Sequence, residues 1–427
     1  MNRLKKHKLN ELYDISSGIS TKPEQYGVGS PFLSFRTIFN NYFIPEELSE
    51  FMNTNESEQK AYSIKKGDVF LTRTSETLDE LAMSCVALKD YPNATFSGFA
   101  KRLRPTQNDI TYDKFMGFFL RSKYFRKIID NNAIMTLRAS FNEKIFSYLN
   151  IELPEYEEQV KIGNLLHLLE EKIELNKKVN IELEKLAKTL YDYWFVQFDF
   201  PDGNNRPYKS SGGKMIFDEK LKRNIPFGWS VNNVKSCIKH INTGLNPRNN
   251  FILNNGDIKY ITVKNLTTHG CIDFSNCDTI DEFAQKIVHK RSDISKGDIL
   301  FASIAPLGRC YLIQEEPQTW DINESVFSIR PQNNIPSEYL YMFLMSETFV
   351  KKAENSSTGS VFAGIRIKTL EGMLLVIPDN KILQLFKEKI SKILLQKHIK
   401  EYENQELTTI RDFLLPMLMN GQVTIQG

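Results

Sequence analysis

Two copies of one short pattern organise this chain: Ile64-Lys65-Lys66-Gly67-Asp68-Val69-Phe70-Leu71 and, 230 residues later, Ile294-Ser295-Lys296-Gly297-Asp298-Ile299-Leu300-Phe301. In each copy a Lys-Gly-Asp turn is followed by an apolar run, which predicts a turn that opens a buried strand. A repeat must be identified first, because a missed repeat misassigns the whole fold.

Four further pairs of segments match in the same order along the chain, at nearly constant offsets. They are 16–19 with 242–245, 32–36 with 260–264, 99–105 with 325–331, and 149–154 with 373–378. Collinear matches of this kind indicate a duplicated globular unit. Strand runs and helical patterns occur together in the chain, so we expect an α/β (α+β) fold.

Each copy ends at a proline that opens a long helical pattern with apolar residues at alternating three- and four-residue spacing. That spacing is typical of a coiled-coil seam. The seam positions are Ile162, Leu165, Leu169, Val179, Leu183, Leu186 and Leu190 in the first pattern, and Phe386, Ile390, Ile393, Leu407, Ile410 and Leu414 in the second. Polar residues interrupt both seams near their middles. The helices are expected to pair with each other; the alternative is two unrelated helices that cap separate domains.

The predicted boundaries follow from these patterns. The segments are a first globular domain at 1–154, a long helix at 155–200, a linker at 201–226, a second globular domain at 227–378 and a second long helix at 379–427. The linker is predicted from its turn residues and its lack of apolar periodicity. The first helix carries 10 acidic and 6 basic residues, so it is not expected to lie along a phosphate backbone.

Composition excludes several classes of protein. A net charge of +3 over 427 residues excludes a histone-like polycation, so DNA binding has to be argued from local sites. No apolar run approaches the roughly 20 residues of a membrane helix, and we expect a cytoplasmic protein. The five cysteines form no Cys-x-x-Cys pair and are expected to be reduced core residues rather than a metal site.

The sequence carries no recognisable catalytic motif. Phosphate-loop, dinucleotide-binding, zinc-protease and nucleophile-elbow patterns do not occur, and no catalytic or metal-binding residue is predicted. Pro201-Asp202 followed by Asp218-Glu219-Lys220 formally spells a metal-dependent nuclease signature. Because the first pair lies in the predicted linker, with no strand to hold it, we interpret that match as chance.

Basic and hydroxyl residues beside the strands and turns of each copy are candidate DNA contacts. Arginine can bind guanine edges with two hydrogen bonds, asparagine can bind adenine, and hydroxyls suit phosphates or either groove. The candidates are Arg36, Thr37, Arg73, Thr74, Arg102, Arg138 and Ser140 in the first copy, and Lys264, Asn265, Ser303, Arg309, Ser360, Arg366 and Lys368 in the second. Arg104 and Arg330, each repeated before a proline, could equally be structural.

Three motifs resemble the specificity (S) subunit of type I restriction–modification systems. Leu153-Pro154-Glu155-Tyr156-Glu157-Glu158-Gln159-Val160-Lys161-Ile162 is similar to the family's Pro-x-x-x-Glu-Gln-x-x-Ile entry to its first conserved helix. Residues 171–187 resemble the continuation of that helix, and Ile225-Pro226-Phe227-Gly228-Trp229 resembles the opening of the second recognition domain. The second helix departs from the pattern, since Pro378-Asp379-Asn380-Lys381-Ile382-Leu383 lacks the Glu-Gln pair.

The resemblance implies a non-catalytic reader of double-stranded DNA. It implies two target-recognition domains in pseudo-two-fold repeat, each reading half of a bipartite asymmetric site, separated by two long helices that form an antiparallel coiled coil. It also implies docking of two methyltransferase subunits and of restriction motor-nuclease subunits. No cofactor is expected in this chain; S-adenosylmethionine, Mg²⁺ and ATP would be bound by the partners. The alternatives are a scaffold that binds two copies of a protein partner, and a nuclease built on the linker carboxylates.

Overall fold

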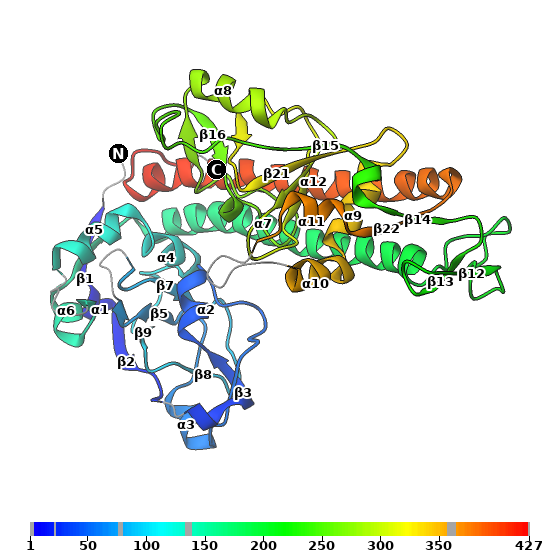
Figure 1. Ribbon diagram of the computed structural model, residues 1–427. Coiled ribbons are helices and arrows are strands. Elements are labelled where there is room, and N and C mark those ends of the chain that lie inside the picture. The colour runs from blue at the N-terminus through cyan, green and yellow to red at the C-terminus, as the bar shows by residue number, and fades with distance from the viewer. Residues whose placement is uncertain (1–3, 21–22, 76–79, 133–138, 357–363, 426–427) are drawn as a thin grey trace. The chain divides into compact units, whose positions relative to one another are not determined.

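The computed structural model describes residues 4–20, 23–75, 80–132, 139–356 and 364–425 (Figure 1). The chain divides into two compact units, one made of Met1–Glu174 with Asn404–Gly427 and the other of Leu175–Glu403. Each unit holds one globular copy and a section of each long helix. Among the described helices, none is long and apolar enough to cross a membrane.

The first copy is built on a four-stranded antiparallel sheet in the order β2-β9-β5-β7. Its strands are Tyr13–Ser17, Ala100–Pro105, Val69–Thr72 and Ser84–Val86. A three-stranded sheet in the order β4-β3-β8 consists of Phe51–Met52, Tyr26–Leu33 and Thr95–Phe96. Two short pairs complete the strands: β1 with β11 (Lys5–Lys8, Asn150–Leu153) and β6 with β10 (Thr74–Ser75, Ala139–Ser140).

Helices cover these sheets and fill the first core. They are α1 (Leu9–Leu12), the 3₁₀ turn η1 (Pro23–Gln25), α2 (Phe35–Asn40), α3 (Glu56–Ala61), α4 (Asp113–Phe119), α5 (Lys123–Asn132) and α6 (Glu143–Tyr148). Phe115, Phe118 and Phe119 of α4 are fully buried beside Val69 and Leu71 of β5. This aromatic helix packs on β7, the strand that pairs with β5.

The second copy repeats the order of the strands in the two larger sheets and in the β1–β11 pair. Its four-stranded sheet, β15-β21-β18-β19, consists of Ile238–Thr243, Val326–Pro331, Ile299–Ala302 and Cys310–Leu312. Its three-stranded sheet, β17-β16-β20, consists of Asp278–Ile280, Ile258–Ile261 and Trp320–Ile322, and β14 (Ser230–Asn233) pairs with β22 (Leu374–Ile377). The predicted duplication and the α/β class are confirmed.

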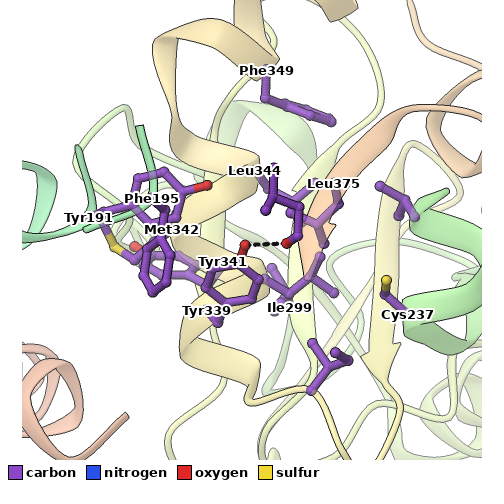
Figure 2. Close-up of a cluster of buried hydrophobic side chains, with 14 of the residues drawn as sticks. Tyr191, Phe195, Cys237, Ile299, Tyr339, Tyr341, Met342, Leu344, Phe349 and Leu375 are labelled. Atoms are coloured by element: carbon purple, nitrogen blue, oxygen red, sulfur yellow. Dashed lines mark hydrogen bonds between the residues drawn. The ribbon is translucent and has the colours of Figure 1, made fainter. Parts of the chain in front are cut away.

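Helices of the second copy pack on its own core. They are η3 (Val234–Cys237), η4 (Val263–Asn265), α8 (Glu282–Ser292), α9 (Ser337–Met345), α10 (Glu347–Asn355) and α11 (Ile367–Glu371). Figure 2 shows Tyr339 and Met342 of α9 beside Tyr191 and Phe195, which come from the end of the first long helix. The rings of Phe195 and Tyr339 meet edge to face at 4.7 Å, so this helix end is part of the second core.

The Lys-Gly-Asp turns form as predicted. Gly67 and Gly297 have φ angles of 84° and 90°, in the left-handed region that glycine adopts without steric cost. Asp68 and Asp298 follow them, and each carboxylate accepts a hydrogen bond from a backbone N–H three residues upstream, at 2.8 and 3.0 Å. The apolar runs then continue as β5 and β18, whose residues are all buried.

The same two aspartates bind the repeated arginines. Arg104 donates to both oxygens of Asp68 at 2.7 and 2.6 Å, and Arg330 donates to both oxygens of Asp298 at 2.7 Å. The aspartates are buried, and paired hydrogen bonds of this geometry are the strong form of a carboxylate–guanidinium contact. Arg104 and Arg330 are therefore structural in both copies.

The long helices are α7 (Tyr156–Tyr191), which ends in the π-helical turn η2 (Asp192–Val196), and α12 (Asn380–Met419). In the first unit Glu170 contacts Arg411 at 2.7 Å, and the Ile173 carbonyl accepts from Asn404 at 3.2 Å. In the second unit Asn176 donates to Glu403 at 3.1 Å, and the Trp194 and Phe386 rings lie 5.7 Å apart. Partner numbers fall along α12 as they rise along α7, so the helices pair antiparallel within each unit.

The Glu-Gln motif at the start of α7 has a structural role. Gln159 is buried, and its amide donates to the carbonyls of Ile110 and Pro154 at 2.8 and 2.9 Å and accepts from the Tyr112 N–H at 3.0 Å. It therefore joins the helix to the loop before α4. The start of α12 is stabilised differently: the Asp379 carboxylate accepts a hydrogen bond from the Ile382 N–H at 3.0 Å.

The segment predicted as a linker, 201–226, is folded, which corrects that prediction. It contains the antiparallel hairpin β12 (Met215–Asp218) and β13 (Arg223–Pro226). The Tyr208 ring stacks on Phe200 at 4.6 Å, and Phe200 stacks on Trp229 at 4.7 Å. Isolated aromatic residues in turns carry no periodic signal, so apolar periodicity does not predict a segment that packs through them.

Candidate nucleic-acid interface

In the first copy, Arg36 and Thr37 lie on α2, which begins directly after β3. Ser34 caps this helix by accepting a hydrogen bond from the Thr37 N–H at 3.2 Å. Arg36 is exposed and lies at an open pocket of about 620 Å³. The pocket is lined by Tyr26, Phe32, Ser34, Phe35, Arg36, Thr37, Asn40, Asn41, Ser49, Glu50, Ser97 and Phe99.

A carboxylate that sequence reasoning missed lies in the same pocket. Glu50 is brought beside β3 by a hydrogen bond from the Phe32 N–H to its carbonyl at 2.8 Å. Its side-chain Oε1 accepts from the Ser34 hydroxyl at 2.5 Å and from the Thr37 hydroxyl at 3.5 Å. No motif marks Glu50 in the sequence, because only the pairing of β3 with β4 places it there.

Arg73 is connected to one residue of this pocket by a backbone hydrogen bond. Its N–H donates to the carbonyl of Phe99 at 2.8 Å, and Phe99 is 62% exposed at the pocket. Thr74 pairs with Ser140 in the short β6–β10 ladder. The side chains of Ser140 and Arg138 lie outside the described residues. The structure therefore places Arg36 and Thr37 at the pocket, whereas Arg73 is exposed one backbone hydrogen bond away from its lining residue Phe99.

Arg102 does not belong to this surface, and its prediction as a DNA contact is corrected. Its side chain is 8% exposed, donates to the Ser63 carbonyl at 2.6 Å and lies 5.4 Å from the centre of the Phe96 ring. Burial lowers the pKa of Arg102 from its ordinary value. Residues 100–103 of β9 are all buried, so this part of the strand is covered on both faces.

In the second copy, Lys264 occupies the place of Arg36, on η4 directly after β16. Its ammonium forms an ion pair with Asp278 of β17 at 3.3 Å, although the lysine side chain remains 61% exposed. A lysine in this position can still reach a phosphate, because a solvent-exposed pair of this kind contributes little and exchanges easily.

Asn265 and Ser303 are buried, which corrects their prediction as DNA contacts. The Asn265 amide oxygen accepts from the Thr262 N–H at 2.9 Å, and its NH₂ donates to the Asp273 carbonyl at 3.3 Å. The Ser303 hydroxyl donates to the Ser325 carbonyl at 2.7 Å. Both side chains stabilise loops instead of facing outward.

The remaining candidates of the second copy differ in exposure. Arg366 and Lys368 are exposed at the start of α11, close to the segment where the Ile365 N–H donates to the Ser303 carbonyl at 2.8 Å. Arg309 is half-buried beside β19. Ser360 lies outside the described residues. Ile365 and Phe141 occupy equivalent places, since the Phe141 N–H donates to the Arg73 carbonyl in the first copy.

The predicted seam residues are distributed between buried and exposed faces. Ile162 is buried in the first core, Phe386 and Ile390 are buried in the second, and Leu190 and Ile393 pack against the second core. The half-buried ones are Leu165, Leu169, Leu183, Leu407 and Leu414. Val179, Leu186 and Ile410 are 36%, 53% and 47% exposed, so these three side chains are not buried between the helices. Ala187 and Tyr191 are buried in α7 instead.

Three exposed apolar residues on each long helix of the second unit lie along one side of that helix. On α7 they are Leu175, Val179 and Leu186, and on α12 they are Leu395, Ile399 and Tyr402. Their spacings of four and seven, and of four and three, place each set along one side of its helix. We call these two sets the outer apolar face. Leu175, Leu186 and Leu395 are the most exposed aliphatic residues of this face, at 55%, 53% and 48%.

Two observations bear on catalysis. Within the described residues, no group of three or more His, Cys, Asp and Glu side chains could hold a metal ion. The nuclease-like carboxylates are used in turns: Asp202 accepts from the Arg206 N–H at 2.9 Å, and Asp218 accepts from the Leu221 N–H at 2.8 Å. Lys220 donates to the Val231 carbonyl at 3.1 Å, so these residues have local structural roles.

Comparison with known proteins gives consistent matches along the chain. The family described as type I restriction modification DNA specificity domain matches residues 2–185 and 227–411. The MjaIX specificity subunit of Methanocaldococcus jannaschii, a type I restriction enzyme, is 24% identical over 98% of this chain and 93% of its own length. The HindI specificity subunit of Haemophilus influenzae is 23% identical over 92% of this chain and 94% of its own length. A crystal structure of an S subunit from M. genitalium has a TM-score of 0.60 at 15% identity, covering 98% of this chain and 96% of that one, and shares the fold.

Proposed function

The chain belongs to the family of type I restriction modification DNA specificity domains, and we propose that its two copies each read one half of a bipartite, asymmetric DNA site. The role of this family is DNA recognition rather than catalysis. In this proposal, α7 and α12 hold the two copies at a set spacing along the duplex. A 36-residue helix such as α7 is about 54 Å long at 1.5 Å per residue, which exceeds one helical turn of DNA.

One observation carries the proposal: the two copies share their strand order but present different side chains at equivalent outer positions. Arg36 in the first copy corresponds to Lys264 in the second. Arginine and lysine are not interchangeable at a base edge, because only arginine has the planar fork that binds guanine with two hydrogen bonds. One scaffold with two different outer edges is what an asymmetric site requires.

The outer apolar face supports docking of methyltransferase subunits. Leu186 and Leu395 are 53% and 48% exposed on the two long helices. We place two methyltransferase subunits on the helices, and restriction motor-nuclease subunits in the larger complex. In this arrangement S-adenosylmethionine, Mg²⁺ and ATP are bound by the partners, and adenine methylation occurs where this chain positions them.

Exchange of one domain tests the reading proposal. Residues 227–377 would be replaced by the equivalent segment of another family member, and methylated adenines would be mapped across the genome of a host that carries the chimaera. We expect one half-site to change and the other half-site and the spacing to stay the same. A chimaera that alters both halves, or a parent chain that directs no bipartite methylation, would contradict the proposal and favour a scaffold without base reading.

Docking is tested by Leu186→Asp. The side chain is exposed, so the chain should fold, whereas a carboxylate buried against an apolar partner surface is costly. We expect capture of the methyltransferase subunit to fall at least about tenfold. Lys185→Asp is the control: Lys185 is the exposed neighbour off the apolar face, and this variant adds the same carboxylate while also removing the ion pair with Glu182. Equal capture by both variants would argue against this docking site.

A further inference from the structure

Strand register places an acidic residue at the same position in both copies. In the second copy Asp278 of β17 lies opposite Tyr260 of β16. In the first copy Phe32 of β3 corresponds to Tyr260, and the Phe32 N–H donates to the carbonyl of Glu50. Glu50 and Asp278 are therefore equivalent, just as Arg36 and Lys264 are. Each copy thus carries one acid and one base at the same outer edge.

The acidic and basic residues at this edge have different partners in the two copies. In the second copy the acid and the base bind each other, with Lys264 Nζ 3.3 Å from Asp278 Oδ2. In the first copy Glu50 binds the hydroxyls of Ser34 and Thr37 instead, and Arg36 forms no ion pair within the part of the chain that the structure describes. Both Glu50 and Arg36 line the open pocket, so both functional groups are left facing a common space.

A carboxylate on a DNA-binding edge restricts what it can contact. Phosphate oxygens repel it, so Glu50 cannot contribute to non-specific grip on the backbone. The groups in DNA that it can accept from are the exocyclic amines in the major groove, and the amine of cytosine is the usual partner of Glu and Asp. Guanine, the base paired with cytosine, presents O6 and N7, which suit the guanidinium of Arg36.

We propose that Glu50 and Arg36 together read one G·C base pair in the first half-site. Glu50 accepts a hydrogen bond from the cytosine amine, and Arg36 donates two hydrogen bonds to guanine. The Ser34 hydroxyl holds the Glu50 carboxylate in position by donating to Oε1, which leaves Oε2 for the base. This inference rests on the proposed function of the chain as a reader of two half-sites.

The experiment uses the full-length chain assembled with its methyltransferase subunits, and duplexes randomised over both half-sites. Bound duplexes are sequenced for the unaltered chain and for Glu50→Ala, Glu50→Gln and Glu47→Gln. Glu47 is an exposed carboxylate on the same segment, so Glu47→Gln is the matched charge control. The second half-site serves as an internal standard for folding and assembly.

We expect the unaltered complex to select a G·C pair at one position of the first half-site. Glu50→Ala should lower the preference at that pair by about tenfold or more and leave the second half-site unchanged. Glu50→Gln, which keeps the contact to Ser34, should also lose selectivity there, with increased acceptance of adenine. Glu47→Gln should select the original sequence.

Two different failures are distinguishable. If the unaltered complex selects no bipartite sequence, the proposed function is wrong. If it selects a bipartite sequence, but Glu50→Gln retains every base preference or the first half-site contains no G·C pair, the reading role of Glu50 is overturned while the proposed function stands. Loss of the whole first half-site with Glu50→Ala but not with Glu50→Gln would assign Glu50 a structural role and would also overturn the inference.

Discussion

The outer edges of the two copies differ more than their interiors do. At the outer edge, Arg36 and Glu50 face an open pocket, whereas Lys264 and Asp278 neutralise each other. In the interior, the arginine–aspartate pairs below the Lys-Gly-Asp turns are repeated with nearly the same distances. The difference shows which parts of a duplicated scaffold are constrained by folding. The other parts can diverge, so that each copy can bind a different DNA sequence.

The physical reason lies in solvent exposure. A buried carboxylate must keep its partner, because an unpaired charge in the interior is costly. An exposed acid or base can change partners at a cost below about 1 kcal/mol, because water solvates it. The interior pairs therefore preserve the fold of each copy, and the outer pairs are free to determine what each copy binds.

Removal of an interior arginine should have the largest effect. Arg104→Ala leaves Asp68 buried without its guanidinium, and Arg330→Ala does the same to Asp298, so each should lower the free energy of unfolding by about 3 kcal/mol. Chemical denaturation, with amide exchange to assign the affected unit, measures the loss. Arg206→Ala removes an exposed pair with Asp202 and should change the stability far less than either of these substitutions. Equal losses for all three variants would contradict the distinction between interior and outer pairs.

Substitution of Arg36 should have the next largest effect. Arg36→Lys keeps the charge but removes the planar fork, so we expect about 1–3 kcal/mol less discrimination at one base pair of the first half-site. Binding to unrelated DNA should change little. The measurement is affinity for cognate and single-mismatch duplexes at several salt concentrations. A uniform loss across all sequences would show that Arg36 contacts phosphate.

Lys264 should behave in the opposite way. Lys264→Ala should weaken binding to all sequences alike and lower the salt slope by about one, because lysine contacts phosphate as a point charge. Asp278→Asn releases Lys264 from its ion pair and should strengthen binding to all sequences. Salt titrations of both variants measure these changes. Base-specific losses with Lys264→Ala would mean that the second copy also reads bases at this edge.

The smallest effect should come from pH: acid should lower the stability of the first unit more than that of the second. His167 is buried in the first unit, with its ring edge-to-face with Phe43 at 4.9 Å, and burial lowers its pKa below the ordinary 6.5. The unfolded chain therefore takes up a proton first, so this contribution to stability is present above pH 6.5 and is lost as the pH falls toward the lowered pKa. Amide exchange at about pH 7.5 and about pH 5.5 should show a selective loss in the first unit. A His167→Gln chain that keeps the same loss would assign it to other groups.

Local patterns in the sequence determined the duplicated architecture. The turns at Gly67 and Gly297, the strands that follow them and the two long helices all depend on neighbours in the chain, so composition and spacing predict them. The same approach misread 201–226, because Tyr208 stacks on Phe200, which precedes the segment and itself stacks on Trp229, which follows it. Heptad spacing also assigned Leu186 and Ile410 to the buried seam. A three-four spacing identifies an apolar helix face, but it does not identify what packs against that face.

Residue type alone identified Arg36 and Lys264 as candidate contacts, because both are cations placed just after a strand. It could not separate them from Arg102, Asn265 and Ser303, whose side chains turn inward. Nor could it find Glu50, which reaches the edge only because β4 pairs with β3. The sequence by itself determined the repeat and its helices and strands. It also identified Arg104 and Arg330 as residues that could be structural. Tertiary structure decided which polar groups face outward, because that depends on strand pairing between residues distant in the chain.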